Sequence, residues 1–79
     1  MPTRLRLFSR PGCHLCDDAR AVLDRVGEPY EDVDIDADDE LFKRYLERIP
    51  VVTLDGEELF EFFADEAVLR ARLREPRVH

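Results

Sequence analysis

Apolar and polar residues alternate at two different periods along this chain. Leucine and arginine alternate over residues 3–8, which predicts a strand with one apolar face. Residues 9–12 contain serine, proline and glycine and predict a loop. Beyond this loop the apolar residues recur at the spacing of one helix face, which predicts a helix from residue 13 to about residue 26. The residues of this stripe are Leu15, Ala19, Val22, Leu23 and Val26.

Glycine, proline and aspartate mark the boundaries of the elements that follow. Gly27 and Pro29 are expected to end the first helix, and residues 30–35 return to the alternation of a strand. Asp38 or Asp39 can accept hydrogen bonds from the first free amides of a second helix. The apolar residues expected on that helix are Leu41, Phe42, Tyr45, Leu46 and Ile49.

A hairpin and a third helix are predicted for the last third of the chain. A strand is expected over residues 51–54, and Asp55-Gly56 predicts a two-residue turn into a return strand over residues 57–61. Asp65 can cap a last helix that ends before Pro76. The side chains of this helix that we expect to face the core are Val68, Leu69 and Leu73.

The order of these elements predicts an α/β fold. Two strands joined by a helix form a parallel pair through a right-handed crossover, whereas two strands joined by a short turn must be antiparallel. A mixed four-stranded sheet in the order β-α-β-α-β-β-α, flanked by helices, satisfies both conditions. The chain has 79 residues, which suffice for one small core, so we expect residues 1–79 to form a single domain.

The charge balance limits the partners that we expect for this protein. The net charge is -7, which argues against binding to nucleic acid and to anionic membrane surfaces. No apolar stretch has the length of a transmembrane helix, and the first residues lack the pattern of a cleaved leader, so we expect a cytoplasmic protein. The acidic run over residues 31–40 is either a solvated edge or a docking face for a basic partner.

Cys13 and Cys16 are the only cysteines, and they lie where the strand pattern gives way to the helical one. A disulfide between them would close too small a loop to stabilise the fold much, and the cytoplasm disfavours permanent bridges, so the pair is expected to serve redox or metal chemistry. The helix N-terminus favours a thiolate at Cys13, whereas Cys16 lies one turn further in. We therefore expect Cys13 to be the nucleophile and Cys16 the resolving thiol. His14 either supports the Cys13 thiolate or is an ordinary surface residue.

Three segments of the chain carry a family resemblance. They are Phe8-Ser9-Arg10-Pro11-Gly12-Cys13-His14-Leu15-Cys16, then Ile49-Pro50-Val51-Val52, then Gly56. With these segments in this order, the chain resembles a glutaredoxin of the thioredoxin superfamily. The resemblance implies a thioredoxin-like fold and a thiol–disulfide oxidoreductase that reduces protein or small-molecule disulfides. It also implies a cis peptide bond before Pro50, with Pro50 facing the cysteines. The substrate-binding residues that it implies are Arg10, Ile49, Pro50 and Val51.

One segment departs from the glutaredoxin pattern. Glutaredoxins typically follow the hairpin with Gly-Gly and an aspartate, which bind glutathione, whereas residues 59–65 of this chain read Leu-Phe-Glu-Phe-Phe-Ala-Asp. The chain is therefore more similar to the divergent small glutaredoxin-like proteins, with electrons from glutathione, another small thiol or a protein reductase. Phe60, Phe62 and Phe63 cannot all point inward from one strand, so we expect at least one of them to be exposed.

The sequence leaves two other functions open. The two thiolates could bind a metal or an iron–sulfur cluster with His14 or His79 as a further ligand, but a four-ligand site would need a dimer because there is no second CxxC. The chain could also be a non-catalytic interaction domain that uses its acidic stretch. We expect no bound cofactor, and nothing in the sequence demands more than a monomer.

Overall fold

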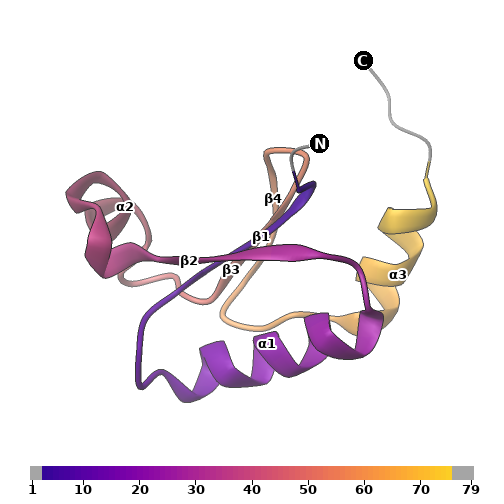
Figure 1. Ribbon diagram of the computed structural model, residues 1–79, viewed down its shortest axis with the longest axis horizontal. Coiled ribbons are helices and arrows are strands. Elements are labelled where there is room, and N and C mark those ends of the chain that lie inside the picture. Colours follow the sequence, from indigo (N-terminus) through magenta and orange to yellow (C-terminus); the bar gives the residue numbers. More distant parts are fainter. Residues whose placement is uncertain (1–2, 76–79) are drawn as a thin grey trace.

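The computed structural model of the protein describes residues 3–75 (Figure 1). Its elements follow one another as β1 (Leu5–Ser9), α1 (His14–Val26), β2 (Tyr30–Asp34), η1 (Ile35–Ala37), α2 (Asp39–Tyr45), β3 (Val51–Leu54), β4 (Glu57–Glu61) and α3 (Glu66–Arg74). This is the predicted order, with the short 3₁₀ helix η1 added between β2 and α2. Pro76, before which the last helix was expected to end, lies outside the described residues. Within residues 3–75, no helix is long and apolar enough to cross a membrane.

The four strands form one mixed sheet in the order β2-β1-β3-β4. β1 lies parallel to β2 and antiparallel to β3, and β3 lies antiparallel to β4, as the sequence predicts. The register places Ser9 opposite Asp34 and Phe8 opposite Val51, so β1 and β2 end, and β3 begins, at the same end of the sheet. The loop that leads to Cys13 leaves the sheet here, and we call this end the cysteine end.

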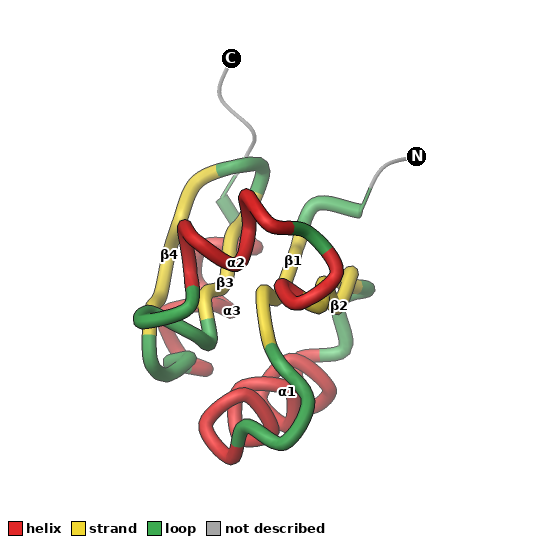
Figure 2. Tube along the Cα trace, turned by 90° about the vertical axis from the view of Figure 1, so that its left-hand side faces the viewer, coloured by secondary structure: helices red, strands yellow, loops and turns green. Residues whose placement is uncertain are grey.

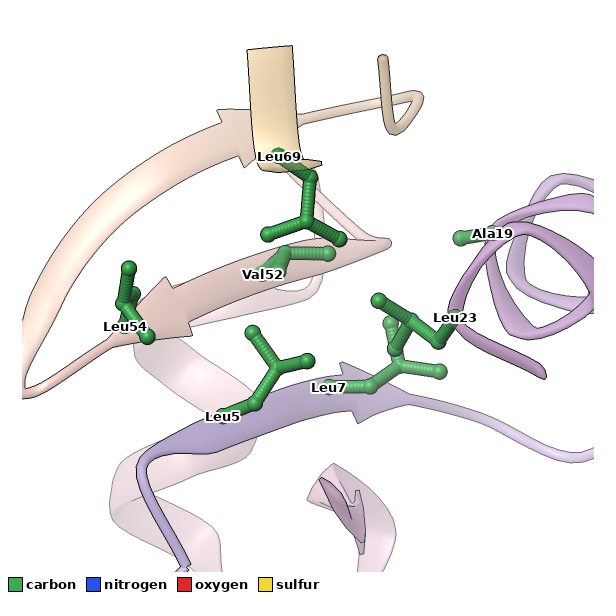
Figure 3. Close-up of a cluster of buried hydrophobic side chains, with 7 residues drawn as sticks. All are labelled: Leu5, Leu7, Ala19, Leu23, Val52, Leu54 and Leu69. Carbon is green, nitrogen blue, oxygen red and sulfur yellow. The ribbon is translucent and has the colours of Figure 1, made fainter. Parts of the chain in front are cut away.

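Two hydrophobic clusters cover the two faces of the sheet. α1 and α3 pack on one face, and α2 packs on the other (Figure 2). Figure 3 shows the buried members of the larger cluster, which are Leu5, Leu7, Ala19, Leu23, Val52, Leu54 and Leu69. The smaller cluster lies at α2 and contains Phe8, Ile35, Tyr45 and Val51. The rings of Phe8 and Tyr45 stack there with their centroids 4.6 Å apart.

Aspartates and glycines fix the ends of elements where the sequence predicts them. Asp38 caps α2 and Asp65 caps α3, each by accepting backbone amides of the first turn. Gly27 ends α1 in the left-handed region with φ of 82°. Asp55 and Gly56 have φ of 51° and 87°, as a two-residue hairpin turn between β3 and β4 requires. These local predictions are confirmed.

The structure corrects the predicted boundaries of two elements. α2 ends at Tyr45, so Leu46 and Ile49 lie outside it. The chain turns more tightly after the helix, because the amide of Arg48 donates to the carbonyl of Tyr45 at 2.8 Å. Ile35 was expected to end the second strand, but it begins η1 instead.

Three residues lie elsewhere than predicted. Ser9 was expected in a loop but ends β1. Leu15 belongs to the apolar stripe predicted for the first helix and Val68 was expected to face the core, yet their side chains are 49% and 46% exposed. In each helix a neighbouring residue is fully buried instead, and side chains one position apart on a helix point in different directions.

Candidate active site

Cys13 lies in the N-cap position of α1. Its Sγ accepts the backbone amide of Cys16 at 3.2 Å, and its carbonyl oxygen accepts the amide of Asp17 at 3.0 Å. Gly12, with φ of 77°, provides the left-handed turn by which the loop enters the helix. Free amides and the positive end of the helix dipole meet at this position, so a negative charge on the Cys13 sulfur is stabilised there.

Cys16 lies one turn into α1 and is fully buried, whereas Cys13 is partly exposed. Both are free thiols. Burial, together with the neighbouring Cys13, raises the pKa of Cys16 to about 12. The backbone of Arg10 and the charge of Arg20 act in the opposite direction and favour the thiolate. The predicted difference in burial is confirmed, and one sulfur is accessible while its neighbour stays protonated in the interior.

Ile49, Pro50 and Val51 lie together at the cysteine end. The peptide bond between Ile49 and Pro50 is cis, as the resemblance implies. Pro50 is buried, and Val51 is buried at the start of β3, opposite Phe8 of β1. Ile49 packs against the smaller cluster. The segment therefore begins the strand next to the one that leads to Cys13, and contact of Pro50 with the cysteines stays a prediction.

The side chain of Arg10 contacts two other parts of the fold. Its Nε donates to Asp36 Oδ1 at 2.9 Å, and its guanidinium lies 5.3 Å from the centre of the Phe42 ring. These contacts tie the loop before Cys13 to η1 and α2. A role for Arg10 in binding substrate stays a prediction.

The two histidines contribute no metal site that the structure describes. His14 is the first residue of α1 and is exposed, and its support for a Cys13 thiolate stays a prediction. Over residues 3–75, no group of three or more histidine, cysteine or acidic side chains could hold a metal ion. His79 lies outside those residues.

The sequence analysis missed a polar cluster that joins β1, α1 and β2, and we call it the Arg20 cluster. Its members are Ser9, Asp17, Arg20 and Asp32. Arg20 donates from Nε to Asp32 Oδ2 at 2.6 Å and from Nη1 to Asp17 Oδ1 at 2.7 Å. Its Nη2 donates to Ser9 Oγ at 3.2 Å, and that hydroxyl donates to Asp32 Oδ1 at 2.7 Å. The sequence signals lie within the predicted helix, where Arg20 follows Cys16 by four residues and Asp17 by three, spacings that place side chains on one face.

Two of the three phenylalanines near the end of β4 are exposed. The exposed fractions of Phe62 and Phe63 are 47% and 63%, whereas Phe60 packs against the larger cluster. The amide of Phe62 donates to the carbonyls of Pro50 and Arg48 at 2.9 and 3.2 Å, so this aromatic segment begins at the cysteine end. The prediction that at least one of the three is exposed is confirmed.

Comparisons with known proteins identify the family and the fold of the chain. The family model described as a glutaredoxin-like domain (DUF836) matches residues 4–74. No functionally curated protein matches the chain. The crystal structure of protein XcR50 from X. campestris is 38% identical, with 87% of this chain and 93% of that chain covered and a TM-score of 0.75. Protein Ne2328 from Nitrosomonas europaea is 29% identical, with 91% and 92% covered and a TM-score of 0.68.

A more distant likeness concerns the fold alone. NrdH-redoxin from Escherichia coli, a glutaredoxin-like protein, is 19% identical, with 94% of this chain and 99% of that chain covered and a TM-score of 0.69. The mixed four-stranded sheet with its flanking helices is thus a thioredoxin-like arrangement. Because the family model spans nearly the whole chain, the protein belongs to the glutaredoxin-like domain family.

Proposed function

We propose that the protein is a thiol–disulfide oxidoreductase that reduces protein or small-molecule disulfides through Cys13 and Cys16. The observation that carries this proposal is the hydrogen bond from the Cys16 amide to Cys13 Sγ at the N-terminus of α1, combined with the full burial of the Cys16 thiol. Membership of the glutaredoxin-like family supports it.

In the first step the Cys13 thiolate attacks one sulfur of the substrate disulfide. A bond forms between Cys13 Sγ and that sulfur, the substrate S–S bond breaks, and the other substrate sulfur leaves as a thiolate that takes a proton from solvent. The partial exposure of Cys13 permits this approach. The amide of Cys16 stabilises the negative charge on the attacking sulfur before the bond forms.

In the second step Cys16 releases the captured half of the substrate. Its thiol loses a proton to solvent, and its sulfur attacks Cys13 Sγ. The Cys13–Cys16 disulfide forms, and the bond to the substrate breaks. The second substrate sulfur leaves as a thiolate and is protonated, so an electron pair has passed from the dithiol to the substrate. Burial keeps Cys16 protonated in the free protein, and it therefore does not compete with Cys13 for substrate.

The surroundings of the pair suggest how substrate and reductant approach. Ile49, Pro50 and Val51 begin the strand beside the one that leads to Cys13, and we expect the substrate to lie along them. Arg10 would have to exchange its contact with Asp36 to bind an anionic substrate.

The oxidised protein would be reduced in the cytoplasm by glutathione, another small thiol or a protein reductase. Comparing the rates at which glutathione and a thioredoxin reductase reduce the oxidised protein would identify its reductant.

Serine substitutions test the roles of the two cysteines. We expect Cys16→Ser to accumulate a mixed disulfide on Cys13 when mixed with hydroxyethyl disulfide, because the resolving thiol is absent. Cys13→Ser should form no adduct, since the remaining thiol is buried. Mass spectrometry after acid quenching measures the adduct, with the unsubstituted protein as the control that turns over. Absence of an adduct in Cys16→Ser would contradict the proposal, and an adduct on Cys16 in Cys13→Ser would reverse the two roles.

A further inference from the structure

Three neighbouring polar groups shift the pKa of the Cys16 thiol. They are the Cys13 thiol, the backbone of Arg10 and the guanidinium of Arg20. Cys13 opposes a negative charge on Cys16, whereas Arg10 and Arg20 favour it. Arg10 directly follows Ser9, the last residue of β1, whose hydroxyl is held by the Arg20 cluster. Arg20 lies four residues beyond Cys16 on the same face of α1, and its guanidinium donates to the hydroxyl of Ser9 at the strand end that precedes Arg10.

Arg20 is held in place from three elements. It lies one turn beyond Cys16 in α1, bound to Asp17 of α1, to Asp32 of β2 and to the hydroxyl at the end of β1. The carboxylates of Asp17 and Asp32 partly offset its charge. Tyr30 of β2, on which the charge of Arg20 also acts, is neutral at physiological pH because burial raises its pKa to about 12. A single guanidinium therefore supplies the positive charge that acts on the Cys16 thiol.

We propose that Arg20 is a positioning residue for the second half of the reaction, in which its charge stabilises the Cys16 thiolate and so speeds release of the substrate from Cys13. The proposal rests on the proposed function, and it concerns only the step in which Cys16 acts. The carboxylate of Asp32 holds Arg20 in place. Its negative charge nevertheless opposes the Cys16 thiolate, because it reduces the net positive charge near the sulfur.

The expected effect is moderate. An opposite charge a few ångströms away shifts a pKa by about one unit or more. The Arg20 side chain is 32% exposed and shares its charge with two carboxylates, so water and the partners weaken its influence. We expect removal of the charge to slow the release step about threefold at any pH at which Cys16 is mostly protonated.

The decay of the mixed disulfide measures the release step directly. Reduced protein is mixed with hydroxyethyl disulfide, an uncharged probe, and the reaction is quenched with acid at intervals between about pH 6 and about pH 9, where exchange depends on the thiolate. Mass spectrometry then follows the adduct on Cys13. Arg20→Gln should slow its decay about threefold at each pH. Arg20→Lys, which keeps the charge, should remain close to the unsubstituted protein.

Two further variants, Asp32→Asn and Arg25→Gln, serve as controls for the sign and the position of the charge. Asp32→Asn should release the substrate faster or at an unchanged rate, because it removes a negative charge. Arg25→Gln removes the same charge as Arg20→Gln from the far end of α1, where Arg25 pairs with Glu66, and it should leave the decay unchanged. Circular dichroism checks that each variant is folded.

Each outcome separates the inference from the function on which it rests. Equal decay in Arg20→Gln and the unsubstituted protein would overturn the role of Arg20. So would slowing of Asp32→Asn to the same degree as Arg20→Gln, since loss of packing in the cluster would then be the cause. Absence of any adduct, in these proteins and in Cys16→Ser, would instead overturn the proposed oxidoreductase.

Discussion

Replacement of Leu69 by alanine tests how the third helix is held on the sheet. Leu69 is fully buried in the larger cluster, where its side chain points toward Val52 of β3 (Figure 3). The residue before it, Val68, is 46% exposed. The helical spacing of apolar residues assigned both side chains to the core, and the structure separates them. The two neighbours therefore form a matched pair for a mutational test of the fold.

The expected loss follows from the carbon atoms removed and from the space they leave. Leu69→Ala removes three carbons that are fully out of water, at about 0.8 kcal/mol each, and the cavity adds to this, so we expect a loss of about 3 kcal/mol. A domain of this size has a free energy of unfolding of only about 3 to 5 kcal/mol. Leu69→Val should lose about 1 kcal/mol, since it removes one carbon.

Urea unfolding followed by circular dichroism measures these losses in the reduced protein. Leu69→Ala should unfold at much lower urea than the unsubstituted protein, with Leu69→Val in between. Val68→Ala should remain within about 0.5 kcal/mol, because its side chain is half exposed and alanine suits a helix better than valine. Equal losses for Val68→Ala and Leu69→Ala would refute the packing described here, as would a loss below about 1 kcal/mol for Leu69→Ala.

Two further predictions concern a helix end and the acid stability of the fold. Gly27→Ala should lose about 1 kcal/mol in urea unfolding because φ is 82° there, although no atom lies close enough to obstruct a β-carbon; Gly27→Asn should lose less, and the reverse order would contradict this. Burial opposes the ionisation of Asp32, but the hydrogen bonds from Arg20 and Ser9 outweigh it and hold the pKa of Asp32 below its ordinary value. Stability due to this carboxylate is therefore present above the ordinary aspartate pKa of about 3.9 and is lost as the pH falls through the lower folded value. Asp32→Asn should show a weaker fall of the urea midpoint over that acid range, and parallel curves would show that the carboxylate contributes nothing.

Much of the fold could be predicted because its boundaries depend on local chemistry. The caps at Asp38 and Asp65 and the turn at Asp55-Gly56 each act within a few residues of themselves, so the sequence identified them. The CxxC pair was identified for the same reason, since the helix that begins at His14 fixes the geometry of both thiols.

The predictions that failed depend on contacts between elements. Val68 and Leu15 fit the helical spacing, but the approach of the sheet decides which side chains it covers. The end of α2 at Tyr45 depends on a turn that leads into the cis bond at Pro50. The Arg20 cluster brings together β1, α1 and β2, and spacing along the chain encodes only its contact within α1.

The arrangement of the strands also accounts for where part of the acidic excess is located. Among the residues that the structure describes, β2 and β4 each have one side without a neighbouring strand, and each carries three carboxylates, whereas β1 and β3 carry none. An open strand offers unpaired amides and carbonyls to any other extended chain, and charged side chains beside them discourage such pairing. The part of the acidic excess that lies on these two edge strands thus discourages aggregation through added strands.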